Sequence, residues 1–160
     1  MKKRESVYFL GIGGIGMSAL ARYFKAKGFD VAGYDRTSTL LTKELEAEGI
    51  SIHYNDDVAL IPELYKDPQN TMVVYTPAIP SDMSELVWFR EQQFNVCKRS
   101  QALGEVTRMQ QAICVSGTHG KTTTSTMIAH LLHNSSVKCN AFLGGISKNF
   151  DRNLLLSNES

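Results

Sequence analysis

The sequence has little of what membrane, disulfide-bonded or nucleic-acid-binding proteins need. Its 160 residues include three cysteines, and 17 basic residues nearly balance 16 acidic ones. An odd cysteine count argues against a disulfide framework, and a net charge of +1 gives no electrostatic reason to bind nucleic acid or an anionic membrane. No apolar run approaches the roughly 18 residues of a membrane span. The basic start at 1–4 lacks the longer apolar region of a secretory signal. We therefore expect a cytoplasmic protein without membrane insertion.

The cysteines and two of the histidines do not form an evident metal site. Cys97, Cys114 and Cys139 have no metal-type spacing, and their apolar flanks predict buried, inert thiols. His130 and His133 lie three apart on a predicted helix, a spacing that could suit a metal. No third ligand is evident nearby, so the pattern favours a solvated helix face.

Apolar strand-like runs alternate with helical patterns along the first two thirds of the chain. Such alternation predicts an α/β fold, a Rossmann-like parallel sheet with right-handed crossovers and flanking helices. One or two helical turns are expected within 56–64. The predicted strands are 6–10, 31–34, 50–53, 71–75 and 95–97, and the predicted helices are 15–27, 42–48, 85–92 and 101–109.

The pattern predicts that a second domain begins near Gln110. The pattern predicts a strand at 112–115, a glycine loop, a helix at 121–133, a strand at 137–142, a turn at 144–145 and the beginning of a strand at 154–156. We therefore expect a Rossmann-like domain over 1–109, followed over 110–160 by the truncated start of a P-loop ATPase domain.

The first glycine motif is Gly11-Ile-Gly-Gly-Ile-Gly16, directly after a predicted strand and opening a helix. Its glycines let the backbone approach a diphosphate, and the helix N-terminus offers free N–H groups. Asp35 ends the next strand, where an acid can accept hydrogen bonds from ribose hydroxyls. NAD, FAD and UDP-sugars all fit this pattern, and a glycine turn that only packs is the non-functional alternative.

The second glycine motif is Gly117-Thr-His-Gly-Lys-Thr122. A usual P-loop has a glycine where this chain has Val115, so the match is to a shorter form. Its N–H groups can form an anion nest, Lys121 can reach the β- and γ-phosphates, and Thr122 can bind Mg²⁺. A threonine-rich helix start would leave Lys121 unexplained. Together the two motifs predict a nucleotide-linked substrate in one domain and ATP in the next, as in ATP-driven ligation.

At these residues the sequence resembles the Mur ligase family of bacterial peptidoglycan synthesis. The motifs at 11–18 and 117–124 carry the resemblance, with support from 49–53, 73–79 and 98–100. The shorter P-loop is the form that the family uses. A Pro-Pro-Met-Ser-Thr stretch typical of the family's tripeptide-recycling branch is absent after Asp35, where this chain reads Arg36-Thr-Ser-Thr-Leu40.

The resemblance implies a carboxylate–amine ligase. ATP with Mg²⁺ would convert the lactyl carboxylate of UDP-N-acetylmuramate to an acyl phosphate, which the amine of L-alanine would attack. For His119, a role at the γ-phosphate and a role in shaping the loop are both open, and His53 is alternatively a plain strand-end histidine. The implied ATP-binding residues are Gly117, Thr118, His119, Gly120, Lys121, Thr122 and Thr123, with Lys121, Thr122 and His119 catalytic and Thr122 a Mg²⁺ ligand. The implied UDP-substrate residues are Gly11, Gly13, Gly14, Ile15, Gly16, Met17, Asp35, Arg36, His53, Thr76, Ala78 and Ile79.

The chain departs from the family pattern in its length. Only 38 residues follow Thr122, without the family's acidic Mg²⁺-binding segment or its C-terminal amino-acid-binding domain. We therefore expect an N-terminal fragment that binds the UDP-substrate without turnover. The alternatives are a NAD- or FAD-dependent oxidoreductase that uses only the first motif, and a non-catalytic nucleotide-binding module.

Overall fold

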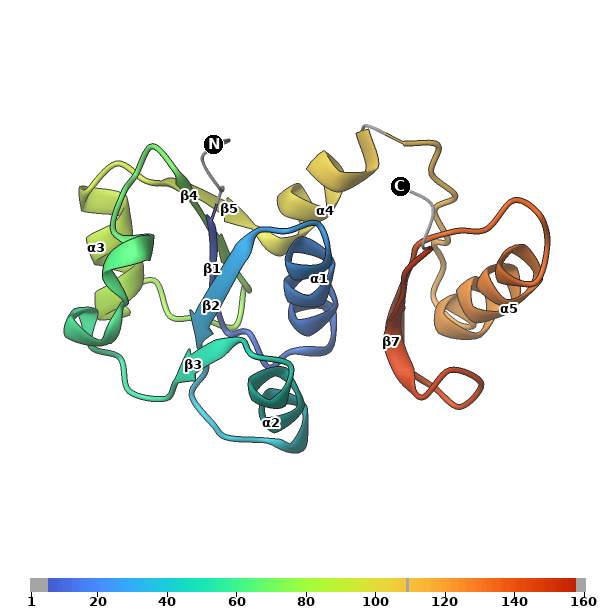
Figure 1. Ribbon diagram of the computed structural model, residues 1–160, viewed down its shortest axis with the longest axis horizontal. Coiled ribbons are helices and arrows are strands. Elements are labelled where there is room, and N and C mark those ends of the chain that lie inside the picture. Colours follow the sequence, from blue (N-terminus) through green and yellow to red (C-terminus); the bar gives the residue numbers. More distant parts are fainter. Residues whose placement is uncertain (1–5, 109, 158–160) are drawn as a thin grey trace.

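The computed structural model describes residues 6–108 and 110–157, and its largest unit is a five-stranded parallel sheet (Figure 1). The strand order β3-β2-β1-β4-β5, with every neighbouring pair parallel, confirms the predicted Rossmann-like sheet. The strands are β1 (Ser6–Leu10), β2 (Asp30–Tyr34), β3 (Ser51–His53), β4 (Thr71–Tyr75) and β5 (Asn95–Lys98).

Helices cover both faces of the sheet, as the right-handed crossovers of a parallel sheet require. Figure 1 shows α1 and α3 on opposite faces. The expected turns within 56–64 are two 3₁₀ segments, η1 (Val58–Leu60) and η2 (Glu63–Tyr65). The helices of this unit are α1 (Ile15–Ala26), α2 (Leu40–Ala47), α3 (Ser84–Glu91) and α4 (Arg99–Arg108), and Met109, the predicted end of α4, lies outside the described residues.

The central strand β1 supplies side chains to a core on each face. Val7 and Phe9 join the cluster packed under α1 and α4, whereas Tyr8 and Leu10 join the cluster packed under α3 and η2. All four are fully buried. This follows from the alternation of side chains in a strand that is covered on both sides.

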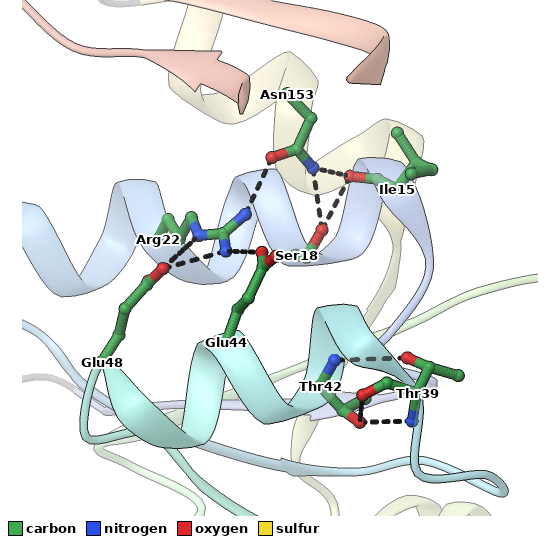
Figure 2. A network of polar contacts seen from close by, with 8 residues as sticks. All are labelled: Ile15, Ser18, Arg22, Thr39, Thr42, Glu44, Glu48 and Asn153. Carbon is green, nitrogen blue, oxygen red and sulfur yellow. Dashed lines mark hydrogen bonds and ion pairs between the residues drawn. The ribbon is translucent and has the colours of Figure 1, made fainter. Parts of the chain in front are cut away.

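Helix α2 begins two residues earlier than its apolar spacing predicts. Thr39 is its N-cap and accepts a hydrogen bond from the Thr42 N–H at 3.2 Å, while the Thr39 N–H donates to Thr42 Oγ1 at 2.8 Å (Figure 2). This reciprocal pair is a capping box in which threonine replaces the usual Glu or Gln. The pattern of apolar residues does not reveal such a cap, which explains the late predicted start.

The C-terminal part contains a helix and a two-stranded antiparallel hairpin. Helix α5 (Lys121–His133) matches its predicted bounds, and β7 (Arg152–Leu155) confirms a strand near 154–156. The strand predicted at 112–115 is wrong, because this segment is irregular and Ile113 is 67% exposed. No strand of the described residues pairs with it, and an unpaired strand leaves its backbone groups unsatisfied.

The second predicted strand and the turn of this part are also corrected. Strand β6 (Ala141–Ser147) begins four residues after the predicted Val137, and Gly144 and Gly145 lie inside it rather than in a turn. A Cβ at Gly144 would stand 3.0 Å from Thr122 Oγ1 of α5. The glycines therefore let α5 lie close against the strand, and β6 continues antiparallel into β7 rather than forming a parallel ladder.

The hairpin packs against α1. Leu154 is 5% exposed and belongs to the same core cluster as Phe9 and Leu20. Beside it, Asn153 contacts the first turns of α1, as Figure 2 shows. The two parts of the chain therefore share one hydrophobic cluster.

One cysteine is more exposed than the sequence predicts, and one histidine is less exposed. Cys97 and Cys139 are half-buried, but Cys114 is exposed because its segment joins no sheet, so its predicted burial is wrong. His130 is exposed as expected, whereas His133 is half-buried against the Phe150 ring. Within 6–108 and 110–157 there is no cluster of three metal-binding side chains, and no helix long and apolar enough to cross a membrane.

Candidate functional site

The five parallel strands end in one row. Leu10 pairs with Tyr34 and Tyr75, which in turn pair with His53 and Lys98. Ligands of open α/β sheets bind outside the carboxyl ends of the strands. The residues that immediately follow the strands are Gly11, Asp35, Tyr54, Thr76 and Arg99, so three of the predicted site residues lie together along this edge.

The first glycine loop is held by Asp35. Its Oδ2 accepts a hydrogen bond from the Gly13 N–H at 2.7 Å, and a Cβ at Gly13 would stand 2.6 Å from Thr42 Cγ2. Only glycine fits this approach. Helix geometry leaves the N–H groups of Ile15 and Gly16 without acceptors inside α1. These two donors and the positive end of α1 are the features that suit an anion.

Asp35 also holds the backbone of two loops by hydrogen bonds, a role that the sequence does not reveal. Besides its bond to Gly13, its other oxygen accepts from the Thr37 N–H at 3.2 Å. A carboxylate has about four acceptor positions, so it still has capacity for ribose hydroxyls. Arg36, next in the chain, is exposed.

The loop after β4 closes over the start of the glycine loop. The Thr76 N–H donates to the Leu10 carbonyl at 3.3 Å, and the Ile79 N–H donates to the Thr76 carbonyl at 3.0 Å. A Cβ at Gly11 would stand 2.5 Å from Thr76 Cγ2 and 3.5 Å from Ile79 Cδ1. Thr76 and Ile79 therefore lie beside Gly11 as predicted, with Ala78 exposed next to them.

Met17 differs from the other residues of the first motif. Its side chain is 1% exposed and packs in the core with Leu20. The sequence predicts Met17 at the diphosphate, but its side chain packs in the core and its N–H donates to the Gly14 carbonyl at 3.0 Å, so neither is free for an anion in this arrangement.

Arg99 is a residue that sequence reasoning missed as part of the site. Its Nη1 lies 2.5 Å from the place where a Cβ on Gly16 would stand. An arginine over a helix N-terminus puts positive charge beside positive charge, which is favourable only when an anion lies between them. The sequence did hold a clue to this position, because Arg99 directly follows the fifth strand of the row.

The second glycine loop leads into α5. Gly120 caps the helix at a φ of 76°, a conformation that favours glycine. Lys121 Nζ donates to the carbonyls of Gly117 at 2.5 Å and Thr118 at 3.2 Å, so the lysine folds over its own loop. The predicted ATP-binding residues lie together here, and His119, Thr122 and Thr123 are all exposed.

A cleft of about 650 Å³ lies between α4 on one side and α5 and β6 on the other. Lys121 and Thr122 line it from α5, and Arg99 lines it from the start of α4. Because Arg99 also lies over Gly16, the same side chain reaches the first glycine loop. The two predicted phosphate-binding helix ends are therefore linked by one cationic residue.

A buried polar cluster lies at the β3 end of the row. The Tyr8 hydroxyl stands 2.5 Å from His53 Nε2 and 3.0 Å from Glu85 Oε2, and His53 Nε2 lies 3.5 Å from Glu85 Oε1. Burial raises the pKa of Glu85 to about 8, with further raising by the carboxylates of Asp56 and Asp57, against hydrogen bonds that lower it. Burial also raises the pKa of Tyr8 above its usual range and lowers the pKa of His53.

His53 lies at the strand end where the sequence predicts it, but its ring is already engaged. Nδ1 lies 2.9 Å from the Asn55 carbonyl and Nε2 faces Tyr8, while the side chain is 16% exposed. Its predicted contact with the substrate is therefore limited to the ring surface in this arrangement. Sequence reasoning missed Tyr8 and Glu85, because neither a strand tyrosine nor a helix glutamate signals burial.

A protein-family model described as "Mur ligase family, catalytic domain" matches residues 6–111, which contain the five-stranded sheet. Among curated proteins, the chain is 59% identical over 156 residues to the UDP-N-acetylmuramate–L-alanine ligase of Porphyromonas gingivalis, covering 98% of the chain and 34% of that protein. It is 59% identical over 160 residues to the enzyme of the same name from Parabacteroides distasonis, covering 100% of the chain and 35% of that protein.

Solved structures show the same likeness. The crystal structure of a UDP-N-acetylmuramate–alanine ligase from Thermotoga maritima matches 93% of the chain and 34% of its own, with a TM-score of 0.82 and 32% identity. A UDP-N-acetylmuramate:L-alanyl-γ-D-glutamyl-meso-diaminopimelate ligase from Neisseria meningitidis matches 95% of the chain and 46% of its own, with a TM-score of 0.84 and 28% identity. The chain thus spans about a third of the length of the curated relatives above.

Proposed function

The chain belongs to the Mur ligase family, and we propose that its protein joins L-alanine to the lactyl carboxylate of UDP-N-acetylmuramate with consumption of ATP, in peptidoglycan synthesis. The names of the relatives that are 59% identical support this substrate pair. The tripeptide-joining relative shares the fold at lower identity, so the L-alanine assignment rests on the closer sequence similarity.

One observation carries the proposal beyond similarity. The cleft lined by Lys121 and Thr122 is also lined by Arg99, which lies over Gly16. A ligase of this type must bring the activated end of a nucleotide-linked substrate to the γ-phosphate of ATP. A cleft at the start of α5, lined also by the arginine that lies over the start of α1, suits that task, whereas a hydride-transfer enzyme has no use for the second loop.

In this proposal the first glycine loop binds the diphosphate of UDP-N-acetylmuramate. The free N–H groups of Ile15 and Gly16 donate to its oxygens, and Arg99 neutralises its charge. Asp35 and Arg36 lie at the ribose end of the site. The surface beside the diphosphate is formed by Thr76, Ala78, Ile79 and the ring of His53.

The second loop suits the phosphates of ATP. Lys121 Nζ rests on the carbonyls of Gly117 and Thr118, a weak arrangement that phosphate oxygens can replace with stronger charge-assisted bonds. Thr122 would hold Mg²⁺, and Thr123 would add a donor from the first turn of α5. When bound, ATP supplies the phosphoryl group that activates the carboxylate, and Lys121 neutralises the charge that develops on it.

We propose that the chain divides functionally near Gln110. Residues 1–109 would bind the UDP-substrate, and residues 110–160 would contribute to the ATP-binding domain. The sheet ends with β5 and α4, and the second glycine loop begins after an irregular segment. This division assigns each nucleotide its own glycine loop.

The proposal is tested by titrating the isotope-labelled 160-residue chain with UDP-N-acetylmuramate, NAD and Mg-ATP while amide resonances are followed by NMR. We expect UDP-N-acetylmuramate to shift the resonances of 11–17, Mg-ATP to shift those of 117–124, and NAD to shift neither set. Binding of NAD in preference to the UDP-sugar would contradict the proposal. We expect no alanine-dependent phosphate release from this chain by itself, and such release would contradict that expectation.

A further inference from the structure

Glu85 is a buried carboxyl group that has no role in the proposed reaction. Its side chain is 0% exposed, and Oε1 has no hydrogen-bond partner. Its other oxygen faces Tyr8, which in turn faces His53 at the crevice. Burying a carboxyl oxygen without a hydrogen bond costs free energy, so the neighbouring donors and acceptors indicate whether Glu85 carries a proton.

The hydrogen bonds of the cluster fix its proton count. The Asn55 carbonyl can only accept, so Nδ1 of His53 carries a proton, and Nε2 of the neutral ring can only accept. The Tyr8 hydroxyl has one proton, yet it lies between two acceptors, His53 Nε2 and an ionised Glu85. Both contacts are hydrogen bonds only if the cluster holds one further proton, either on Glu85 or on Nε2.

The surroundings place that proton on Glu85. An ionised Glu85 would leave a charged oxygen, Oε1, buried without a hydrogen bond, because the nearby His53 Nε2 lies 3.5 Å away and is engaged with the Tyr8 hydroxyl at 2.5 Å. A neutral carboxyl group costs far less there. The Asp56 carboxylate raises the pKa of Glu85 as well, whereas Asp57 raises it by its charge and lowers it by a backbone hydrogen bond. Tyr34 and Tyr65, which face the cluster from β2 and η2, add no charge because burial raises their own pKa values. Burial also lowers the pKa of His53, which keeps its ring neutral.

We propose that Glu85 and Tyr8 are positioning residues: a protonated Glu85 donates to the Tyr8 hydroxyl, which donates to Nε2 of a neutral His53 whose Nδ1–H is bonded to the Asn55 carbonyl. In this state His53 has no free N–H and no charge to offer. It presents the remaining exposed part of its ring, which packs on Tyr34 at 5.6 Å between centroids. The consequence for nucleotide recognition rests on the proposed function: His53 contributes ring contact to the nucleotide rather than a hydrogen bond to phosphate.

When Glu85 loses its proton, the Tyr8 hydroxyl has one proton for two acceptors, and Nε2 of His53 loses its donor whenever Tyr8 turns to the Glu85 carboxylate. The Asp56 carboxylate accepts from the N–H groups of Ser84 and Glu85 at 2.8 and 3.0 Å, so the loop after β3 is tied to the start of α3. A change at Glu85 therefore reaches the His53 end of the crevice through two routes, the Tyr8 hydroxyl and the Asp56 loop.

The test is imidazole nitrogen NMR on the 160-residue chain from pH 6 to pH 9. The chain has four histidines, and His53→Asn identifies the relevant signal. We expect the neutral Nδ1–H tautomer throughout, with a change in the Nε2 shift on the alkaline side. Glu85→Gln should keep this tautomer, because its amide donates to Tyr8, and should abolish the alkaline change. Glu63→Gln, at an exposed glutamate, should leave the wild-type behaviour intact.

Two results would overturn the proposal: a wild-type His53 that gains a proton around pH 6.5 like a free histidine, or an alkaline change that persists in Glu85→Gln. Should Glu85→Gln fail to fold, Tyr8→Phe serves instead. It removes the hydroxyl between Glu85 and His53, so the His53 Nε2 shift should no longer change on the alkaline side. UDP affinity at pH 7 and pH 8.5 adds a functional measure. We expect a several-fold loss at pH 8.5 in the wild type and none in Glu85→Gln. Absence of UDP binding at both pH values would contradict the proposed function, while the NMR result still decides where the proton lies.

Discussion

The side-chain amide of Asn153 donates a hydrogen bond to the backbone carbonyl of Ile15 at 2.6 Å, across 138 positions of the chain. The same nitrogen donates to Ser18 Oγ at 2.8 Å, and the amide oxygen accepts from Arg22 Nη1 at 2.9 Å. Arg22 is held in turn by Glu44 of α2 and by Glu48, the C-cap of that helix (Figure 2). Asn153 thus fastens the hairpin to α1, in the turn that directly follows the first glycine loop.

Asn153→Ala should lower the free energy of unfolding by about 2–3 kcal/mol, because one buried and two part-buried hydrogen bonds are lost and Arg22 Nη1 loses its acceptor. Urea denaturation followed by circular dichroism measures the change. Asn149→Ala, at an exposed position of the same hairpin, should change stability by less than about 0.5 kcal/mol. Equal effects of the two substitutions would show that the Asn153 contacts do not hold the hairpin.

The stability of the wild type should fall as the pH rises from 7 to 8. The pKa of Glu85 is about 8 in the fold and near 4.3 when unfolded, so only the folded state keeps the proton in this range. The resulting loss is about 1 kcal/mol per pH unit. It ends above the folded pKa. His53 opposes it only slightly, because its lowered pKa keeps it neutral in the fold and the unfolded histidine is already mostly neutral above pH 7. Urea midpoints at pH 7.0, 7.5 and 8.0 test this, and the Glu85→Gln midpoint should stay constant.

Gly13→Ala should weaken UDP binding by at least about tenfold, equivalent to 1.4 kcal/mol. The added Cβ would displace the Asp35 carboxylate and the Thr42 methyl group, and with them the loop that faces the diphosphate. Gly104→Ala is the matched control, since a Cβ there meets nothing within 4 Å in α4. It should stabilise the protein by about 0.5–1 kcal/mol and leave UDP binding unchanged, as calorimetric titration would report.

Arg99→Met should weaken the binding of UDP by about tenfold and reduce its salt dependence, because one cation beside the diphosphate is removed. Arg108→Met removes an arginine from the other end of the same helix, where it pairs with Glu105. That control should bind UDP like the wild type. The prediction fails if both variants lose affinity to the same extent.

Lys121→Met should abolish most Mg-ATP binding while leaving UDP binding intact, since the lysine lies in the second loop only. Lys138→Met provides the comparison, because Lys138 contacts the carbonyl of His133 at the far end of α5. Fluorescence titration with a labelled ATP analogue measures both. A parallel loss of UDP affinity in Lys121→Met would contradict separate sites for the two nucleotides.

The sequence predicted the sheet well because its central strands β1 and β4 are mostly apolar and are followed by breakers, Gly11 after β1 and Pro77 after β4. The run Ser6–Leu10 before Gly11 is the best example. The position of Asp35 and Thr76 followed from this, since parallel strands bring their carboxyl ends to one edge. The same reasoning placed His53 correctly without revealing what its ring contacts.

The C-terminal part was predicted less well because its apolar segments could not be told apart by pattern. Segment 112–115 has the composition of a strand but no neighbour to pair with in the described chain. Gly144 resembles a turn glycine, yet the approach of Thr122 requires it within a strand. Glu85 escaped notice because its burial depends on Tyr8 and His53, which are 77 and 32 positions away in the sequence.

The contact of Leu154 with the core under α1 has a consequence for the order of folding during synthesis. The ribosome releases the sheet strands well before the hairpin, so the surface of α1 that Leu154 and Phe142 cover first meets solvent. This exposed apolar strip is available to chaperones or to other nascent chains until the hairpin emerges. A ribosomal pause between α1 and the hairpin would therefore prolong the interval in which the growing chain is prone to aggregate.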